Sequence, residues 1–166
     1  MSIIDQLLFA LTLVAALGCG LVAGVFFAFS AFVMKALSHL PTGEGIAAMQ
    51  SINVAVLNPW FLGLFLGTAA VCLVALIYSL LQWNEPGAIY LLFGGTLYLV
   101  GCFLVTIAFN VPRNEALASV APGDIDGESR WIDYVATWTA WNHVRTVAAL
   151  AGAASFGIAL GHGSFS

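Results

Sequence analysis

The amino-acid sequence predicts an all-α membrane protein in which four transmembrane helices form one bundle. Hydrophobic residues make up 61% of the 166 residues and charged residues only 7%, whereas soluble domains carry roughly 25% charged residues. A chain of this length is expected to form a single domain, residues 1–166. Four basic residues are too few for a nucleic-acid-binding surface, so the expected partner is the lipid bilayer. The apolar segments long enough to cross a hydrocarbon core of about 30 Å lie at about residues 5–37, 59–83, 86–110 and 130–160.

The first segment, residues 5–37, is longer than a bilayer requires. As a helix it would extend about 50 Å, so its far end is expected to project from the membrane. Pro41 then interrupts the helix, and Thr42 can cap a short one over about residues 44–56. That helix is too short to span the membrane, and we expect it to be re-entrant or interfacial, as a lid on the bundle.

The second and third spans are joined by a tight turn at residues 84–87. Asn58 and Pro59 are typical of a helix start, with an N-cap side chain followed by proline in the first turn. The third span is expected to end before Pro112, because the residue preceding a proline disfavours helical dihedral angles. Residues 113–130 would then be a polar connection. The fourth helix, about 48 Å long, should project at the same end as the first.

The first half of the fourth helix carries an unusual polar and aromatic stripe. At about 100° per residue, one face collects side chains spaced three or four residues apart, with Trp141 at its edge. A buried arginine costs several kcal/mol unless it meets a polar cavity or a partner. The stripe is therefore predicted to form one wall of a polar vestibule at the projecting end of the bundle. Its members are Trp131, Tyr134, Trp138, Asn142 and Arg145.

Several motifs resemble the anthrone oxygenase-like family of small four-helix membrane proteins. They are GVFFAFSAFVMKAL in the first helix, AAMQSIN followed by NP, the Asn110–Asn114 segment NVPRN, and WNHVRT at residues 141–146. Most members of that family are bacterial proteins of unknown function, and some fungal members oxidise anthrones to anthraquinones. The resemblance implies a monooxygenase that uses O₂ as co-substrate without an obvious redox cofactor, and a small hydrophobic aromatic ligand.

The chemistry implied by the resemblance can be assigned to residues of this chain. An anthrone has an acidic C–H beside a carbonyl, so its oxidation needs a base, groups that hold the developing oxyanion, and a flat aromatic slot. Arg145 and Asn142 are predicted to hold the oxygen, and His143 is the nearest base, although it lies about 100° from Asn142 around the helix. The predicted substrate-binding residues are Ser30, Met49, Gln50, Asn53, Asn110, Asn114, Tyr134, Trp138 and Trp141.

Other interpretations stay open at this stage. The aromatic stripe is equally typical of an interfacial aromatic belt, and His143 of a structural hydrogen bond. Met34 and Met49 could bind copper, although core packing is favoured and we predict no metal site; two histidines on different helices could bind haem. The chain could thus be a non-enzymatic binder or carrier of a hydrophobic molecule or haem. It could also be a structural homo-oligomer joined through glycine-rich helix faces such as Gly20 and Gly24.

The distribution of basic residues predicts the orientation. Lys35, Arg113 and Arg130 flank the spans at one end, and the other end has no lysine or arginine. The positive-inside rule therefore places both termini outside the cytoplasm. We expect the bacterial inner membrane as the location.

Overall fold

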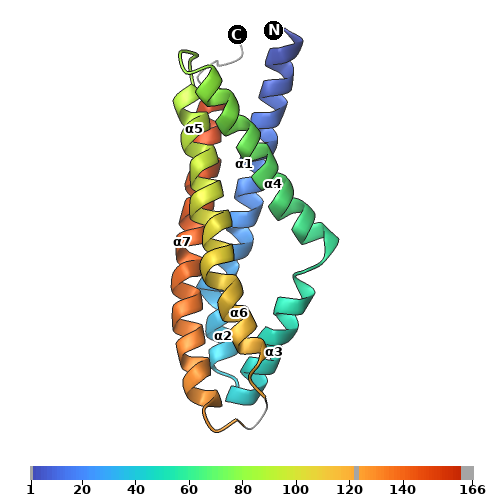
Figure 1. Cartoon of the computed structure of the whole chain (residues 1–166), viewed down its shortest axis with the longest axis vertical. Coiled ribbons are helices and arrows are strands. Elements are labelled where there is room, and N and C mark those ends of the chain that lie inside the picture. Colours follow the sequence, from blue (N-terminus) through green and yellow to red (C-terminus); the bar gives the residue numbers. More distant parts are fainter. Residues whose placement is uncertain (1, 122–123, 162–166) are drawn as a thin grey trace.

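Four long helices dominate the computed structural model, which describes residues 2–121 and 124–161 (Figure 1). The first consists of α1 (Ile3–Ala28), a π-helical turn η1 (Phe29–Val33) and α2 (Met34–Ser38). The second is α4 (Pro59–Leu81), and the fourth is α7 (Gly127–Gly161). All four are long and apolar enough to cross a membrane, which confirms the all-α membrane bundle. The third helix contains α5 (Ala88–Thr96), η2 (Leu97–Leu104), η3 (Thr106–Asn110) and α6 (Val111–Ala118).

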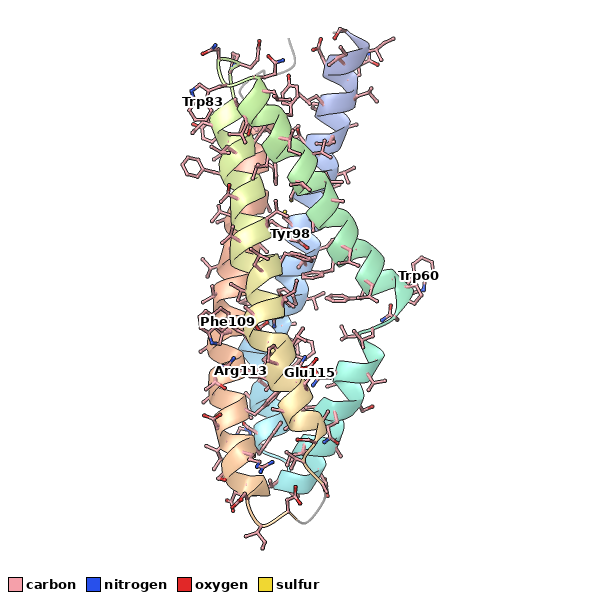
Figure 2. The ribbon with its side chains drawn as sticks, viewed as in Figure 1. Trp60, Trp83, Tyr98, Phe109, Arg113 and Glu115 are labelled. Carbon is pink, nitrogen blue, oxygen red and sulfur yellow. The ribbon has the colours of Figure 1, made fainter. Side chains whose placement is uncertain are left out.

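The helices differ in length, and this sets the shape of the molecule. With 23 residues, α4 extends about 34 Å and matches a hydrocarbon core, whereas the other three have 31 to 36 residues. Trp60 and Trp83, at its two ends, are exposed (Figure 2), as tryptophans at the two membrane interfaces would be. The first, third and fourth helices therefore continue beyond α4 at one end, where Lys35, Arg113 and Arg130 lie. At the opposite end α1 begins and α7 ends.

A short helix covers the projecting end. Helix α3 (Thr42–Ala55) has 14 residues and packs against α2, α6 and α7 (Figure 1). The lid helix predicted at residues 44–56 is thus present, and at about 21 Å it is too short to span a bilayer. Asn58 caps α4 as expected, because its side-chain oxygen accepts hydrogen bonds from the N–H groups of Trp60 and Phe61, both at 3.0 Å.

The third helix differs from the prediction. It was expected to end by residue 110, but it runs through Pro112 to Ala118. Two π-helical segments, η2 and η3, lie immediately upstream. In a π-helix the N–H of residue i+5 bonds the carbonyl of residue i. This shifted hydrogen-bond register accommodates a proline, which has no N–H and would clash in a regular α-helix. Arg113 and Asn114 consequently lie on a helix beside α7, and the connection shortens to residues 119–126.

The Gly20 and Gly24 pair faces outward from the bundle. A Cβ atom added at Gly20 or Gly24 would meet nothing within 4 Å, so this pair does not mediate helix packing within the chain. Close approaches occur instead at other glycines, such as Gly95, where a Cβ would lie 2.8 Å from the carbonyl oxygen of Cys72. Whether the outward-facing pair joins two subunits stays a prediction.

Candidate functional site

The side chain of Arg145 is buried where the four-helix bundle passes into the projecting end. Only 4% of the residue is exposed. Its Nη1 donates to the Thr106 hydroxyl at 3.2 Å, and its Nη2 donates to the Asn142 side-chain oxygen at 2.7 Å. Thr106 belongs to η3, so the guanidinium joins the third and fourth helices.

Two aromatic faces complete the surroundings of this guanidinium. Its Cζ lies 4.1 Å from the ring centroid of Phe26 and 5.1 Å from that of Trp138, distances at which cation–π attraction is favourable. No carboxylate pairs with Arg145 among the described residues, and its Nε is buried without a hydrogen-bond partner. The result is an unneutralised cation held between aromatic rings in an apolar bundle.

Asn142 connects this cation to the first helix. Its Nδ2 donates to the carbonyl oxygen of Phe26 and to the hydroxyl of Ser30, both at 2.6 Å. The Phe26 carbonyl lies at the entry to η1, where the change to π-helical register disturbs the usual i+4 pairing. Asn142 thus adds a second donor to a carbonyl oxygen that also accepts from the Phe29 N–H. Both N–H bonds of the Asn142 amide are used in this way, and its side-chain oxygen accepts the hydrogen bond from Nη2 of Arg145.

A stack of aromatic rings extends from the cation toward the lid. Trp131 and Tyr134 stack at 5.8 Å between ring centroids, and Tyr134 and Trp138 at 6.2 Å. The side-chain oxygen of Asn114 accepts hydrogen bonds from the Tyr134 hydroxyl and the Trp138 indole N–H, each at 2.9 Å. One residue of α6 therefore fixes two rings of α7. Met49 of the lid is buried against the same cluster.

Further buried polar atoms near this region lack partners. Asn110 donates through Nδ2 to the Trp138 carbonyl at 3.2 Å, but its Oδ1 has no hydrogen bond, and neither does Nδ2 of Asn53. Asn110 lies one helical turn after Thr106, the partner of Arg145. Most buried polar groups in proteins are paired, so a set of unpaired ones is typical of a place that receives water or a polar ligand.

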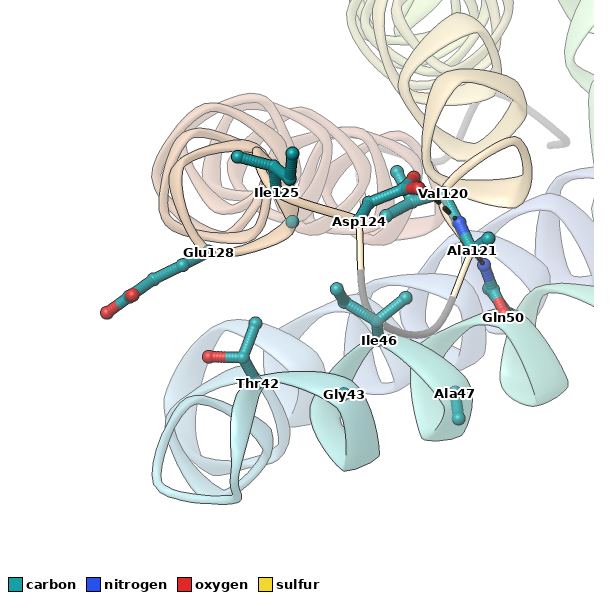
Figure 3. Close-up of a pocket in the computed structure, with 11 residues that line it drawn as sticks. Thr42, Gly43, Ile46, Ala47, Gln50, Val120, Ala121, Asp124, Ile125 and Glu128 are labelled. Carbon is teal, nitrogen blue, oxygen red and sulfur yellow. Dashed lines mark hydrogen bonds between the residues drawn. The ribbon is translucent and has the colours of Figure 1, made fainter.

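Two cavities lie toward the projecting end. The first, about 300 Å³, separates α3 from residues 120–121 and 124–128, and Figure 3 shows Ile46, Gln50 and Asp124 around it. Gln50 also donates to the carbonyl oxygens of Leu117 at 2.9 Å and Val120 at 3.1 Å, which holds the lid to the end of α6. The second cavity, about 260 Å³, lies between α6 and α7.

Neither of these cavities is lined by Arg145 or Asn142. The polar vestibule predicted beside them is filled instead by large side chains from three helices and the lid. Met34 and Met49, which were considered as copper ligands, are part of that packing. The buried members of this cluster are Met34, Leu37, Ile46, Met49, Leu117, Val120, Trp131, Tyr134 and Trp138.

Comparison with known proteins identifies the family of the chain. A family model described as anthrone oxygenase matches residues 60–155, which is more than half of the chain. The chain belongs to the anthrone oxygenase family. No curated protein and no solved structure matches it. In this anthrone oxygenase family member, the matched range runs from α4 into α7 and holds Thr106, Asn114 and Arg145. The residues contributed by the first helix and the lid lie before it.

Two predicted site residues on α7 of this anthrone oxygenase family member lie apart from Arg145 and the aromatic stack. His143 is exposed on α7, as its angular offset from Asn142 indicated, so the structure does not bring the proposed base to Arg145. Trp141 is half-buried and stacks on Phe109, with 3.6 Å between ring centroids and 7° between the planes. It therefore belongs to a different surface of α7 from Trp138.

Two side chains that contact Arg145, those of Thr106 and Phe26, were not predicted. Thr106 precedes Asn110 by four residues and so shares its helix face, a signal that could have identified it. Phe26 gives no such signal, because nothing in the sequence shows how the first helix is rotated against the fourth.

Metal-ligating groups do not gather within the described ranges 2–121 and 124–161, where no three histidine, cysteine or acidic side chains form a cluster. His39 and His143 are exposed. His162, the third histidine, lies outside the described residues.

Proposed function

We propose that this protein is a membrane-embedded monooxygenase that uses O₂ to oxidise a lipophilic aromatic or phenolic substrate of the anthrone class. Membership of the anthrone oxygenase family supports the reaction class. The observation that carries the site assignment is the guanidinium of Arg145, buried without a carboxylate partner and with Nε unpaired. A fixed cation in an apolar setting favours formation of an enolate or phenolate oxygen beside it.

The chemistry balances without an external reductant. Loss of one methylene proton from an anthrone gives an enolate, whose negative oxygen Arg145 would bind. The enolate carbon transfers electrons to O₂ and forms a C–O bond, which gives a hydroperoxide once protonated. Loss of the second hydrogen of that carbon, with cleavage of the O–O bond, leaves a carbonyl and releases water. One oxygen atom enters the quinone and the other leaves as water, so the substrate supplies all the electrons.

The roles of the neighbouring residues follow from their hydrogen bonds. Asn142 already donates to Phe26 and Ser30, so it positions Arg145 and does not contact the substrate in this proposal. Asn114 orients Tyr134 and Trp138, whose rings offer flat apolar surfaces to an aromatic substrate. We assign no role to His143, because its side chain is exposed on α7.

A substrate must displace side chains to reach Arg145. The lid α3 is the element best suited to move, because it packs on the aromatic stack and is held to α6 through one glutamine. Asn53, whose Nδ2 is buried and unpaired, belongs to that lid. We therefore propose that the substrate enters at the projecting end, beneath α3.

The test is oxidation of an anthrone by the full chain in lipid nanodiscs. Anthraquinone formation is followed by absorbance and O₂ uptake by an electrode, with protein-free nanodiscs as the control for spontaneous oxidation. Arg145→Lys keeps the charge but loses the planar guanidinium, and we expect turnover to fall roughly 10²-fold. Lys35→Arg, the reverse exchange at an exposed position, should leave the rate unchanged.

Two outcomes would favour the other functions. Tight binding of the anthrone without turnover would indicate a binder or carrier, and a haem spectrum in the purified protein would identify that ligand. If neither binding nor turnover exceeds the protein-free control, a structural homo-oligomer becomes the better interpretation. Its subunit contact would use outward-facing glycines such as Gly20 and Gly24.

We also propose the bacterial inner membrane as the location, with both termini on the non-cytoplasmic side. Lys35, Arg113 and Arg130 lie at the end of the bundle opposite the start of α1. The positive-inside rule assigns that projecting end, with the lid, to the cytoplasm.

A further inference from the structure

We propose that the cavity between α6 and α7 binds a phosphate group, as presented by the headgroup of an anionic phospholipid. This site is separate from Arg145 and does not depend on the proposed oxidation. The cavity has a volume of about 260 Å³, which is sufficient for a phosphate and its nearest substituents. Its lining residues are Arg113, Ala116, Leu117, Ser119, Val120, Arg130, Asp133, Tyr134 and Thr137.

The charge of the lining favours an anion. Arg113 and Arg130 reach the cavity from two facing helices, against one carboxylate, that of Asp133. Neither arginine forms an ion pair with Asp133 or with any other carboxylate in the part of the chain that the structure describes. Two of the four basic residues of the protein thus meet at one cavity, and the one carboxylate there is not paired with either of them.

The guanidinium of Arg113 is held in place before any ligand binds. Its Nε donates to the Thr137 hydroxyl at 3.0 Å, and its Nη1 donates to the Phe109 carbonyl at 2.7 Å. Nη2 makes no hydrogen bond with the described residues and stays available to a ligand. In Figure 2 Arg113 lies between α6 and α7, whereas Glu115 is drawn on the other side of α6. A planar guanidinium with a fixed orientation suits phosphate oxygens.

Arg130 supplies the mobile half of the site. It is exposed near the start of α7, and its side chain makes no hydrogen bond with the described residues. Its side chain can therefore close over a bound group.

The depth of the cavity favours a lipid over a soluble anion. Arg113 lies seven residues beyond Thr106 in the third helix, about 10 Å further toward the projecting end. Thr106 bonds Arg145, whose Cζ lies 4.1 Å from the ring centroid of Phe26; that ring is 6.5 Å from Phe61 in the first turn of α4, where exposed Trp60 indicates the membrane interface. Arg113 is therefore at the height of lipid headgroups, where basic pockets between transmembrane helices bind lipid phosphates.

Native mass spectrometry of the detergent-purified full chain tests this site. Short-chain phosphatidylglycerol and phosphatidylcholine are titrated separately, and the fraction of protein carrying lipid is measured. We expect preferential retention of phosphatidylglycerol by the wild type. Arg130→Gln should weaken that retention about fivefold, the effect of one basic residue at an anionic lipid surface. Lys35→Gln, which removes an exposed cation outside the cavity, should leave it unchanged.

Arg113→Gln should weaken retention further, but it also removes two structural hydrogen bonds. The Arg130 variant therefore decides the outcome. Inorganic phosphate is titrated in parallel, with ³¹P line broadening as the readout. Broadening that depends on Arg130, without lipid retention, would support the anion site and assign it to a soluble phosphate. Equal retention of phosphatidylglycerol by the wild type and Arg130→Gln, or no binding of either probe to the wild type, would overturn the proposal.

Discussion

Replacing Gly45 by alanine should loosen the lid. A Cβ atom at this position would lie 2.9 Å from Cζ2 of Trp131 and 3.0 Å from the carbonyl oxygen of Leu37. The first contact involves a buried ring of the aromatic stack, and the second involves a backbone atom. Neither can yield without shifting α3 away from α7 or α2, and overpacking of this kind typically costs 1–3 kcal/mol.

Gly43 offers a matched control in the same helix. A Cβ there would meet nothing within 4 Å. Alanine is a better helix former than glycine by about 1 kcal/mol, and this gain applies to both variants. The difference between Gly45→Ala and Gly43→Ala therefore isolates the contact with Trp131 and Leu37.

Hydrogen–deuterium exchange of the α3 amides measures the effect. An opening free energy lower by 1–3 kcal/mol corresponds to exchange roughly 5- to 150-fold faster in Gly45→Ala than in Gly43→Ala. Exchange in the half of α7 that follows Arg145 should not change. Equal exchange of α3 in the two variants would show that the lid does not rest on Trp131 as described.

Three further predictions concern Asn142, the hydrogen bonds of Gln50 and the membrane orientation. Asn142→Leu leaves Nη2 of Arg145 without a partner and removes the side-chain bonds to the Phe26 carbonyl and the Ser30 hydroxyl, so the melting temperature should fall by roughly 5–10 °C, measured by thermal unfolding in detergent. An unchanged melting temperature would mean that these bonds contribute nothing to stability. Gln50→Ala removes the bonds to the carbonyls of Leu117 and Val120, and exchange of α3 should become roughly 5- to 30-fold faster, while Ser51→Ala at an exposed site should have no effect. Cysteines placed along α3 should label only from the cytoplasmic side, and a cytoplasmic reporter fused after residue 166 should be inactive; an active reporter would reverse the proposed orientation.

Much of the fold could be predicted because bilayer thickness sets the length of apolar runs. The start of α4 was predictable as well, since Asn58 and Pro59 act through local capping geometry. The end of the third helix was not. The rule that proline ends a helix assumes a regular α-helix upstream, whereas η3 provides a π-helical register before Pro112.

The candidate site, like the fold, could be predicted only in part. Helical spacing predicted that Trp138, Asn142 and Arg145 share a face, and the structure places them together. Their partners on other helices, such as Phe26, depend on the rotation of each helix in the bundle, which one sequence does not reveal. A polar vestibule was predicted because polar groups were counted without the volume of the aromatic rings beside them. Its catalytic role stays a prediction.

Isotope labelling tests the central claim most directly. The full chain in nanodiscs is mixed with an anthrone under ¹⁸O₂, and the initial rate of ¹⁸O incorporation into the quinone is measured by mass spectrometry. We predict one ¹⁸O atom in each quinone formed, at a rate well above protein-free nanodiscs, and a roughly 10²-fold lower enzymatic rate in Arg145→Lys folded as stably as the wild type. Incorporation by the wild type no faster than in protein-free nanodiscs, or at the same rate in Arg145→Lys, would contradict a monooxygenase site at Arg145.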